Sequence, residues 1–430
     1  MKKISIGIIG MGTIGGGVVK ALRERAALVE QKTDLRLSIK KVCVKHPGRK
    51  RDVFLPRGVL TRDVRQILRD PDIQIVVELI GGIHPAKEYV MEALRRGKHV
   101  VTANKALLAE AGKEIFRLAE RKKRGILFEA SVGGGIPIIK SLREGFASNH
   151  IHAIFGIING TSNFILTRMT ETGCTFKEAL EEAQKRGYAE RNPSLDIDGV
   201  DSAHKLAILT LLGFGKEVPF KKISIEGIRH VSPQDIQYAG EMGYLVKLLA
   251  SAKQTPKGLG VRVHPTLIPK ENPLASVRGI YNAITVRGDL VGETNFYGKG
   301  AGRFPTASAV LSDILDLAKG VCKNESLEPH FHFKSGVQRI KSMEALSSRY
   351  YFRFSVVDRP GVLSKISHIL GRRRISIASV IQQETHKTGS VPLVMVTHEA
   401  LERDVRKAIR AIDQLGVVKA RSVFFRIEKV

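Results

Sequence analysis

A glycine-rich turn near the start of the chain constrains the fold more than any other feature. Isoleucines at positions 4, 6, 8 and 9 predict a buried strand, and a helical pattern follows at 18–30. Between them lies the segment Gly10-Met11-Gly12-Thr13-Ile14-Gly15. Glycines in this context let a backbone approach a pyrophosphate at the N-terminus of a helix. The alternative is a plain tight turn, but the order strand, turn, helix favours dinucleotide binding at Gly10, Gly12, Thr13, Ile14 and Gly15.

Further strands alternate with helices over the first 130 residues. Apolar runs at 35–45, 73–79 and 99–104 predict strands, and 86–96 and 106–123 predict helices. This alternation indicates an α/β fold with a parallel, doubly wound sheet of the Rossmann type. Ligands bind at the carboxyl ends of such strands, where Gly81, Thr102 and Lys105 lie. A lysine is unfavourable at the start of a helix, so Lys105 has another reason to be there.

Basic residues follow the second predicted strand. A cofactor without a 2′-phosphate usually meets an acid at this point, but here Lys45 and Arg49 come first and no acid occurs before Asp52. These cations favour NADP over NAD, which stays possible. The alternative is an exposed basic loop, which a net charge of +28 makes common in this chain.

The stretch from Ala183 to Lys205 concentrates acidic residues before a helix. Glu190, Asp196 and Asp201 precede Lys205. Asp201 and Lys205 are four positions apart, so they leave the same helix face. Carboxylates beside an ammonium group can bind a small zwitterion and move a proton. The alternative is an ordinary surface helix with one ion pair.

A second glycine-rich segment, Gly133-Gly134-Gly135, joins a predicted strand to a helix expected at 138–147. Glu129, which has a carboxylate side chain, lies a few positions before these glycines, which expose backbone carbonyls. Oxygen ligands of this kind suit a hard cation. A glycine hinge between domains explains the segment equally well.

Several of these segments resemble homoserine dehydrogenases along essentially the whole chain. The longest match comprises Ala183, Gly187-Tyr188-Ala189, Asn192-Pro193, Asp196, Gly199, Asp201 and Lys205, and shorter ones are Thr102-Ala103-Asn104-Lys105, Asn159-Gly160-Thr161-Ser162-Asn163 and Gly298-Lys299-Gly300-Ala301-Gly302. The resemblance implies NAD(P)H-dependent reduction of L-aspartate 4-semialdehyde to L-homoserine, in threonine, methionine and isoleucine biosynthesis. It also implies a monovalent cation, sodium in our assignment, bound by Glu129 and the backbone of Val132, Gly134 and Ile136, and places Lys105 in the active site and Gly302 near the cofactor.

The chemistry of that reaction suggests roles for the polar residues. Hydride addition to an aldehyde produces an alkoxide, which needs a proton donor. We expect Lys205 to be the donor, with Lys105 as its partner or as the second candidate. We expect Asp201 to orient Lys205, and Glu190 and Asp196 to bind the substrate. Aspartate-semialdehyde dehydrogenase chemistry is the rival, but it needs a cysteine nucleophile beside a histidine, and Cys43, Cys174 and Cys322 lie in no such segment.

The last 80 residues predict the order βαββαβ, a ferredoxin-like unit. With the turn Asp358-Arg359-Pro360-Gly361, this tail resembles an ACT domain, which implies pairing of tails and L-threonine as effector; a dimerisation module without ligand is the alternative. We therefore expect an NAD(P)-binding domain at 1–130 completed by a helix at 303–320, an α+β catalytic and dimerisation domain at 131–302, a linker at 321–348 and an ACT domain at 349–430.

Composition limits the remaining classes. The cysteines form no motif, and no apolar run is long enough to span a membrane, which together predict a cytoplasmic protein. The charge of +28 admits a nucleic-acid-binding protein. However, the basic residues are scattered and no nucleic-acid motif accompanies them. We expect a homodimer or homotetramer that binds a small substrate, and no nucleic acid or membrane.

Overall fold

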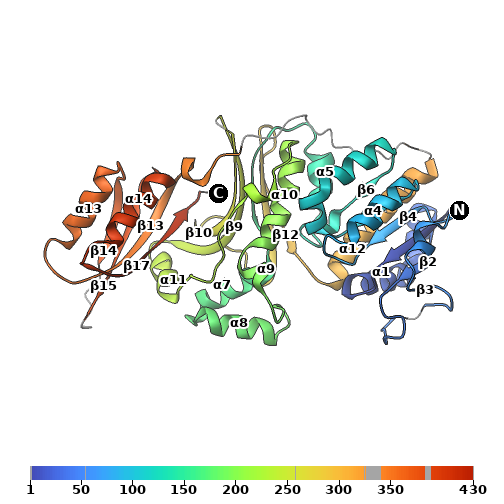
Figure 1. The fold of residues 1–430 in the computed structure, drawn as a ribbon, viewed down its shortest axis with the longest axis horizontal. Helices are drawn as coiled ribbons and strands as arrows, with labels where there is room; N and C mark the ends of the chain where they lie inside the picture. Colours follow the sequence, from blue (N-terminus) through green and yellow to red (C-terminus); the bar gives the residue numbers. More distant parts are fainter. Residues whose placement is uncertain are drawn as a thin grey trace. The chain divides into compact units, whose positions relative to one another are not determined.

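The computed structural model describes residues 1–430 apart from 1, 54, 257, 324, 326–339, 383–388 and 430 (Figure 1). Much of the linker expected at 321–348 therefore lies outside the described residues. The chain divides into two compact units. The first comprises Met1–Ile154, His204–Lys221 and Tyr281–Val337, and the second comprises Phe155–Ala203, Lys222–Ile280 and Gln338–Val430.

The first unit contains a parallel sheet with the strand order β3-β2-β1-β4-β5-β6. The strands are β1 (Lys2–Ile9), β2 (Leu35–Cys43), β3 (Leu60–Thr61), β4 (Ile75–Glu78), β5 (His99–Thr102) and β6 (Ile126–Leu127). Apolar side chains of β1 and β4, such as Ile6, Ile8 and Ile75, are completely buried. The predicted Rossmann-type domain is confirmed.

Helices of the first unit connect or cover these strands. They are α1 (Thr13–Glu24), α2 (Ala26–Thr33), α3 (Arg65–Leu68), α4 (Ala86–Arg95), α5 (Lys105–Arg121), α6 (Ile138–Lys140) and α12 (Arg303–Lys323). α12 extends beyond the helix expected at 303–320. It lies beside α1 (Figure 1), where a Cβ on Gly17 would come within 2.8 Å of the Arg303 side chain. The helix expected at 138–147 is wrong in part, because a π-helix (Ser141–Gly145) replaces the regular turns after α6. A hairpin of β11 (Tyr281–Gly288) and β12 (Gly292–Lys299) completes the unit.

The second unit combines short helices with an extended sheet. Its helices are α7 (Gly160–Thr172), α8 (Phe176–Lys185), α9 (Ser194–Ile197), α11 (Pro233–Glu241), α13 (Val362–Arg372) and α14 (Glu402–Asp413). Strands β9 (Tyr244–Thr255), β10 (Gly258–Pro269), β17 (Val418–Ile427), β13 (Ser347–Val356), β15 (Val391–Thr397) and β14 (Ile377–Gln382) neighbour one another in that order. β7 (Ile151–Ile157) and α10 (Val200–Phe214) each cross the boundary between the units.

The tail of the chain has its own core and is also joined to the preceding part of the second unit. β13, α13, β14, β15, α14 and β17 follow the predicted order βαββαβ. Tyr350, Phe352 and Phe354 of β13 are completely buried in this core. β17 pairs in parallel with β10, with Thr266 opposite Arg426 and Leu267 opposite Ile427. The tail therefore continues the sheet to which β9 and β10 belong.

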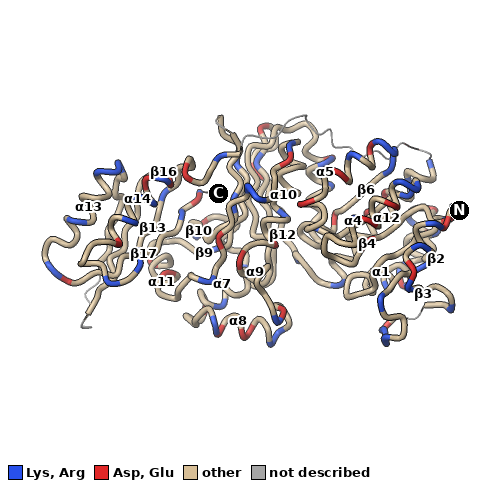
Figure 2. The backbone as a smooth tube through the Cα atoms, in the orientation of Figure 1, with Lys and Arg blue, Asp and Glu red and all other residues tan. Residues whose placement is uncertain are grey.

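Charges are distributed over both units. Figure 2 shows Lys and Arg along many elements, interleaved with Asp and Glu. Among the described residues, no helix is long and apolar enough to cross a membrane. Cys43, Cys174 and Cys322 are free thiols. The cytoplasmic location stays a prediction.

Candidate functional site

The glycine-rich turn between β1 and α1 leaves room for a ligand at one position. Gly10 has φ +99°, and a Cβ there would meet the Leu79 carbonyl oxygen at 2.7 Å, while a Cβ on Gly15 would meet the Gly10 oxygen at 2.2 Å. Close packing therefore explains why positions 10 and 15 are glycine. Gly12 immediately precedes α1, and apart from its two neighbours in the chain no described residue has an atom within 4 Å of its Cβ position. Its open side and the N–H groups that begin α1 at Thr13 and Ile14 suit the close approach of a pyrophosphate.

A buried carboxylate organises the ends of β4 and β5. Glu78 is completely buried and accepts hydrogen bonds from the Thr102 hydroxyl at 2.6 Å and from the Ile80 N–H at 2.8 Å. These contacts fix the turn that contains Gly81, which is exposed and has φ +73°. Thr102 is itself buried, so its role here is to hold Glu78. Glu78 belongs to no recognised motif and was not among the predicted site residues, although its place at the end of a strand was a usable signal.

The loop after β2 is shaped by its own arginine. The Arg51 guanidinium donates to the carbonyl oxygens of His46, Pro47 and Arg49 at 2.7–2.8 Å. The side chains of Lys45 and Arg49 are exposed in this loop. The loop therefore presents two cations at the end of β2, where a 2′-phosphate is bound in dinucleotide folds.

The first acid after this strand is already paired. Asp52 accepts two hydrogen bonds from Arg303 at the start of α12, one of them 3.0 Å long, and this contact lowers the pKa of Asp52. Gly302 immediately precedes Arg303, is exposed and has φ +121°. Arg303 neutralises the negative charge of Asp52. The Asp52 carboxylate therefore does not repel a 2′-phosphate bound near this loop.

Lys105 lies on α5, and Lys205 lies on the part of α10 that belongs to the first unit. Lys105 is the first residue of α5 and is half-buried, and Asn104 caps this helix by accepting the Leu107 N–H at 3.1 Å. On α10, Lys205 is only 8% exposed. Its neighbour His204 contacts Glu110 of α5, with 3.3 Å between Nε2 and Oε1. The structure thus places both predicted lysines on a pair of helices held together by polar contacts.

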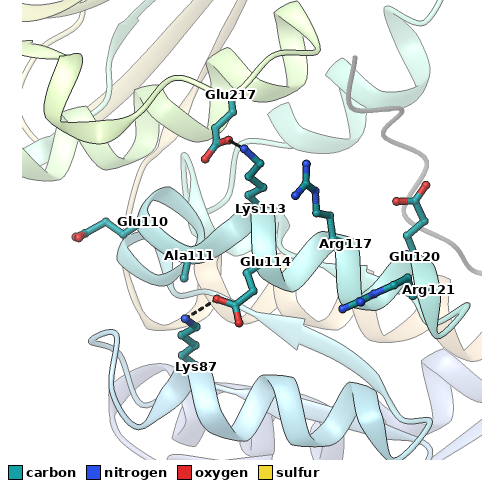
Figure 3. A pocket seen from close by; sticks show the side chains of 9 residues that line it. All are labelled: Lys87, Glu110, Ala111, Lys113, Glu114, Arg117, Glu120, Arg121 and Glu217. Atoms are coloured by element: carbon teal, nitrogen blue, oxygen red, sulfur yellow. Dashed lines mark ion pairs between the residues drawn. The ribbon is translucent and has the colours of Figure 1, made fainter. Parts of the chain in front are cut away.

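The outer side of α5 forms a charged pocket, shown in Figure 3. Ion pairs cross it between Lys87 and Glu114 at 2.6 Å and between Lys113 and Glu217 at 2.9 Å. Four basic side chains are balanced by four acidic ones: Lys87, Lys113, Arg117 and Arg121 against Glu110, Glu114, Glu120 and Glu217. This balance favours no charged ligand, so we assign the pocket to holding α5 between α4 and the end of α10.

A single amide connects the two aspartates in the second unit. Asn159 Nδ2 donates to Asp196 Oδ1 at 2.7 Å and to Asp201 Oδ2 at 2.8 Å. Its Oδ1 accepts the N–H of Ser162 at 2.8 Å and so caps α7. The structure therefore brings Asp196 and Asp201 together. The segment that contains Asn159 is recognisable in the sequence, but this bridging role was not predicted.

Glu190 lies in the turn that follows α8. The Thr161 hydroxyl donates to the Tyr188 carbonyl at 2.7 Å, and Gln184 donates to the Glu190 carbonyl at 3.2 Å. These bonds hold the backbone, while the Glu190 side chain is exposed. Glu190 is therefore positioned by its backbone and available to a ligand from solvent.

Glu129 is buried and already binds protein donors. Its carboxylate accepts N–H groups of Ile139 at 2.9 Å and Lys140 at 2.7 Å, and burial raises its pKa. The Ile136 carbonyl accepts the N–H of Ile138 at 2.8 Å. In the described part of the chain, no group of three or more His, Cys, Asp or Glu residues could hold a metal ion. The expected ligands are thus oxygen atoms of the type a hard cation takes, but two of the four already accept hydrogen bonds.

Gly134 stands at the close approach of two segments beside Glu129. It has φ +54°, and a Cβ there would meet the Gly300 carbonyl oxygen at 2.6 Å. This contact joins the segment after β6 to the segment before α12, and both belong to the first unit. The same glycine therefore has a structural explanation that does not require a cation.

Comparison with known proteins identifies the same parts of the chain. Family models match as "Homoserine dehydrogenase, NAD binding domain" at 10–129, "Homoserine dehydrogenase" at 137–315 and "ACT domain" at 350–417. Homoserine dehydrogenases of Neisseria gonorrhoeae and Bacillus subtilis are 43% and 39% identical, with 100% of this chain and at least 99% of each relative covered.

Solved structures agree. The crystal structure of a homoserine dehydrogenase from Thiobacillus denitrificans is 43% identical in sequence and superposes with a TM-score of 0.94. The match covers 100% of this chain and 99% of the Thiobacillus chain. A hyperthermophilic archaeal homoserine dehydrogenase in complex with NADPH is 29% identical with a TM-score of 0.64, over 76% of this chain and 99% of its own. The glycine-rich turn, the lysines on α5 and α10 and the bridged aspartates thus occur in an NAD(P)-dependent oxidoreductase, and the chain belongs to the homoserine dehydrogenase family.

Proposed function

We propose that this protein reduces L-aspartate 4-semialdehyde reversibly to L-homoserine, with Lys205 as proton donor. The observation that carries this proposal is the Asn159 bridge between Asp196 and Asp201. Asp201 lies in the first turn of the continuous helix α10, on which Lys205 follows one turn later. One helix thereby links the acidic group, suited to a substrate ammonium, with a buried lysine suited to its carbonyl end.

The chain's residues supply binding and proton transfer. When bound, the nicotinamide supplies a hydride to the aldehyde carbon. In our proposal Lys205 Nζ gives its proton to the developing alkoxide, with Lys105 as its partner on α5. Asp201, fixed by Asn159, orients Lys205 from the preceding turn. Asp196 and Glu190 bind the substrate ammonium.

If Glu190 has this role, Glu190→Gln raises the KM of the semialdehyde. An unchanged KM would show that Glu190 does not bind the substrate.

NADP is the cofactor that the loop after β2 favours. Replacing both Lys45 and Arg49 by Ser should raise the KM of NADPH about tenfold, since two exposed ion pairs contribute roughly 0.5–1 kcal/mol each. The KM of NADH should stay the same, because NADH lacks the 2′-phosphate. A matched control replaces the exposed Lys419 and Arg421 of β17 by Ser. Equal weakening of both cofactors by the first pair would show that the loop does not select NADP.

A monovalent cation, sodium in our assignment, is proposed at Glu129 with the backbone oxygens of Val132, Gly134 and Ile136. The support is the set of oxygen ligands and the buried carboxylate. Replacing sodium by choline at constant ionic strength should lower turnover several-fold, because the cation would fix the segment between β6 and α6. Glu129→Gln should abolish this dependence. Equal turnover in both salts would contradict the cation site.

L-threonine is proposed as an effector of the tail, in keeping with a place in threonine, methionine and isoleucine biosynthesis. Gly361, with φ +82°, precedes α13 and lets a ligand approach its first N–H groups. Two tails of a homodimer or homotetramer would pair at this site. Titration with L-threonine should inhibit the full chain, whereas L-valine should not. No inhibition by L-threonine would leave the tail as an assembly module.

A further inference from the structure

A cluster of ionic groups around the buried side chains of Arg426 and Glu402 joins the tail to the segment after β8 (Ser224–Ile225). Arg426 of β17 is 2% exposed and donates two hydrogen bonds to the carboxylate of Glu226, at 2.8 and 2.9 Å. Arg406 of α14 donates to the same carboxylate at 3.0 Å. Glu402, also in the tail, accepts from both arginines and from the Tyr350 hydroxyl. Two tail arginines therefore hold one carboxylate outside the tail, and the bidentate pair that Arg426 makes fixes direction as well as distance.

The residues that follow Glu226 pack closely against the end of α9. A Cβ on Gly227 would lie 2.4 Å from the Ile197 carbonyl oxygen and 2.6 Å from the Cα of Asp198. The next residue, Ile228, donates its N–H to the same Ile197 carbonyl at 2.8 Å. The close packing leaves no slack between segment 226–229 and the end of α9, so a displacement of Glu226 changes the support of that helix.

A side-chain contact strengthens the same connection. Arg229 donates to Asp198 Oδ2 at 2.9 Å and to the Ser194 hydroxyl at 3.2 Å. Ser194 and Asp198 stand at the two ends of α9, which therefore rests on segment 226–229 along its whole length. Because α9 is a single turn and cannot be stable alone, its position depends on such contacts.

We infer that Glu226, held by Arg426 and Arg406 of the tail, is a positioning residue for the substrate site through segment 226–229 and α9. The inference rests on the proposed role of Asp196, which belongs to α9 and meets Asp201 through Asn159. Every contact in this route lies within the second unit. The carboxyl-terminal strand thus sets where the substrate-binding carboxylate stands, and any change in the tail that moves Arg426 changes substrate affinity.

A second contact between the tail and the rest of the unit provides a matched control. Arg353 of β13 donates to both oxygens of Asp235, at 2.6 and 3.0 Å, and Tyr351 donates to Asp235 at 3.1 Å. This pair is also bidentate, and it is more buried than the pair at Glu226, whose side chain is 40% exposed. Asp235 belongs to α11 and not to segment 226–229. Loosening this pair weakens the attachment of the tail without acting on α9.

The test compares Glu226→Gln with Arg353→Lys in the full chain. Glu226→Gln removes the charge and keeps the shape, so the two arginines retain Glu402. We expect it to raise the KM of the semialdehyde about tenfold, with the KM of NADPH and the turnover number almost unchanged. Arg353→Lys should lower the thermal midpoint but leave both KM values the same. Equal changes in the semialdehyde KM in the two variants, or none with Glu226→Gln, would overturn the inference.

Two further variants keep the result decisive. Gly227→Ala displaces α9 and changes no side chain of the ion cluster. It should raise the KM of the semialdehyde, so it replaces Glu226→Gln if that variant does not fold.

Asp196→Asn tests the proposed function itself. If Asp196→Asn raises the KM and the Glu226 and Gly227 variants do not, only the positioning role fails. If Asp196→Asn leaves the KM unchanged, the proposed role of Asp196 fails and the positioning role fails with it. In the double variant, Glu226→Gln should add little to Asp196→Asn, because the route ends at that carboxylate.

Discussion

Replacing Lys205 by Ala is expected to lower turnover at least about a hundredfold, which is the usual contribution of a positioned proton donor. Lys205 is 8% exposed on α10, so solvent has little access to replace its proton. The dissociation constant of NADPH should stay the same, since we propose that the nucleotide binds at the turn between β1 and α1. Single-turnover kinetics and NADPH titration measure both quantities. Near-normal turnover in this variant would remove Lys205 from the chemical step.

Two comparisons separate proton transfer from general loss of charge. Lys113→Ala removes an exposed lysine of α5 that pairs with Glu217 and should change turnover less than twofold. Lys205→Arg keeps the charge, but a guanidinium remains protonated and is a poor proton donor. This variant should therefore stay nearly as slow as Lys205→Ala. Recovery of turnover with Arg would make the residue an electrostatic group and not the donor.

Ending the chain at Leu346 is expected to unfold much of the second unit. Truncation removes β13 to β17 and exposes the edge of β10 at Thr266 and Leu267. It also leaves Asp235, which is completely buried, and Arg262, which is 3% exposed, without their tail partners Arg353 and Glu428. Breaking one buried ion pair typically costs about 3–5 kcal/mol, a large share of the stability of a domain.

Thermal unfolding of the full and truncated chains measures this effect. We expect the truncated chain to lose the transition of the second unit, or to show it at a midpoint lower by more than about 5 °C. Activity with the semialdehyde should fall in parallel, because Asp196 and Asn159 belong to that unit. An unchanged midpoint with full activity would show that the tail is an independent module.

The sequence predicts the elements of the tail but not its attachment. The polar segment after α12 suggests a module on a linker, and the strand and helix pattern of the tail itself is local and readable. The attachment depends on Glu226 meeting Arg426, 200 residues away, and on β10 pairing with β17. Neither residue belongs to a motif, and an isolated Glu or Arg is normally an exposed residue. Such contacts follow only from the folded chain.

The site follows the same rule. The turn from Gly10 to Gly15 is recognisable because strand, turn and helix are adjacent in sequence. Asp201 and Lys205 are recognisable because helical geometry relates residues four apart. The bridge from Asn159 to Asp196 and Asp201 spans 37 and 42 residues, and its asparagine has a complete local explanation as a helix cap. Because capping α7 already explains this asparagine, the sequence gives no sign that it also bridges the two aspartates.

Oxidation of NADPH on addition of L-aspartate 4-semialdehyde tests the proposed reaction most directly. The purified full chain is mixed with NADPH, the semialdehyde is added, and both the loss of NADPH and the formation of L-homoserine are measured. We predict one molecule of L-homoserine for each NADPH oxidised, and loss of both signals in Lys205→Ala. Absence of NADPH oxidation with the semialdehyde, or oxidation without L-homoserine, would contradict the proposed reaction.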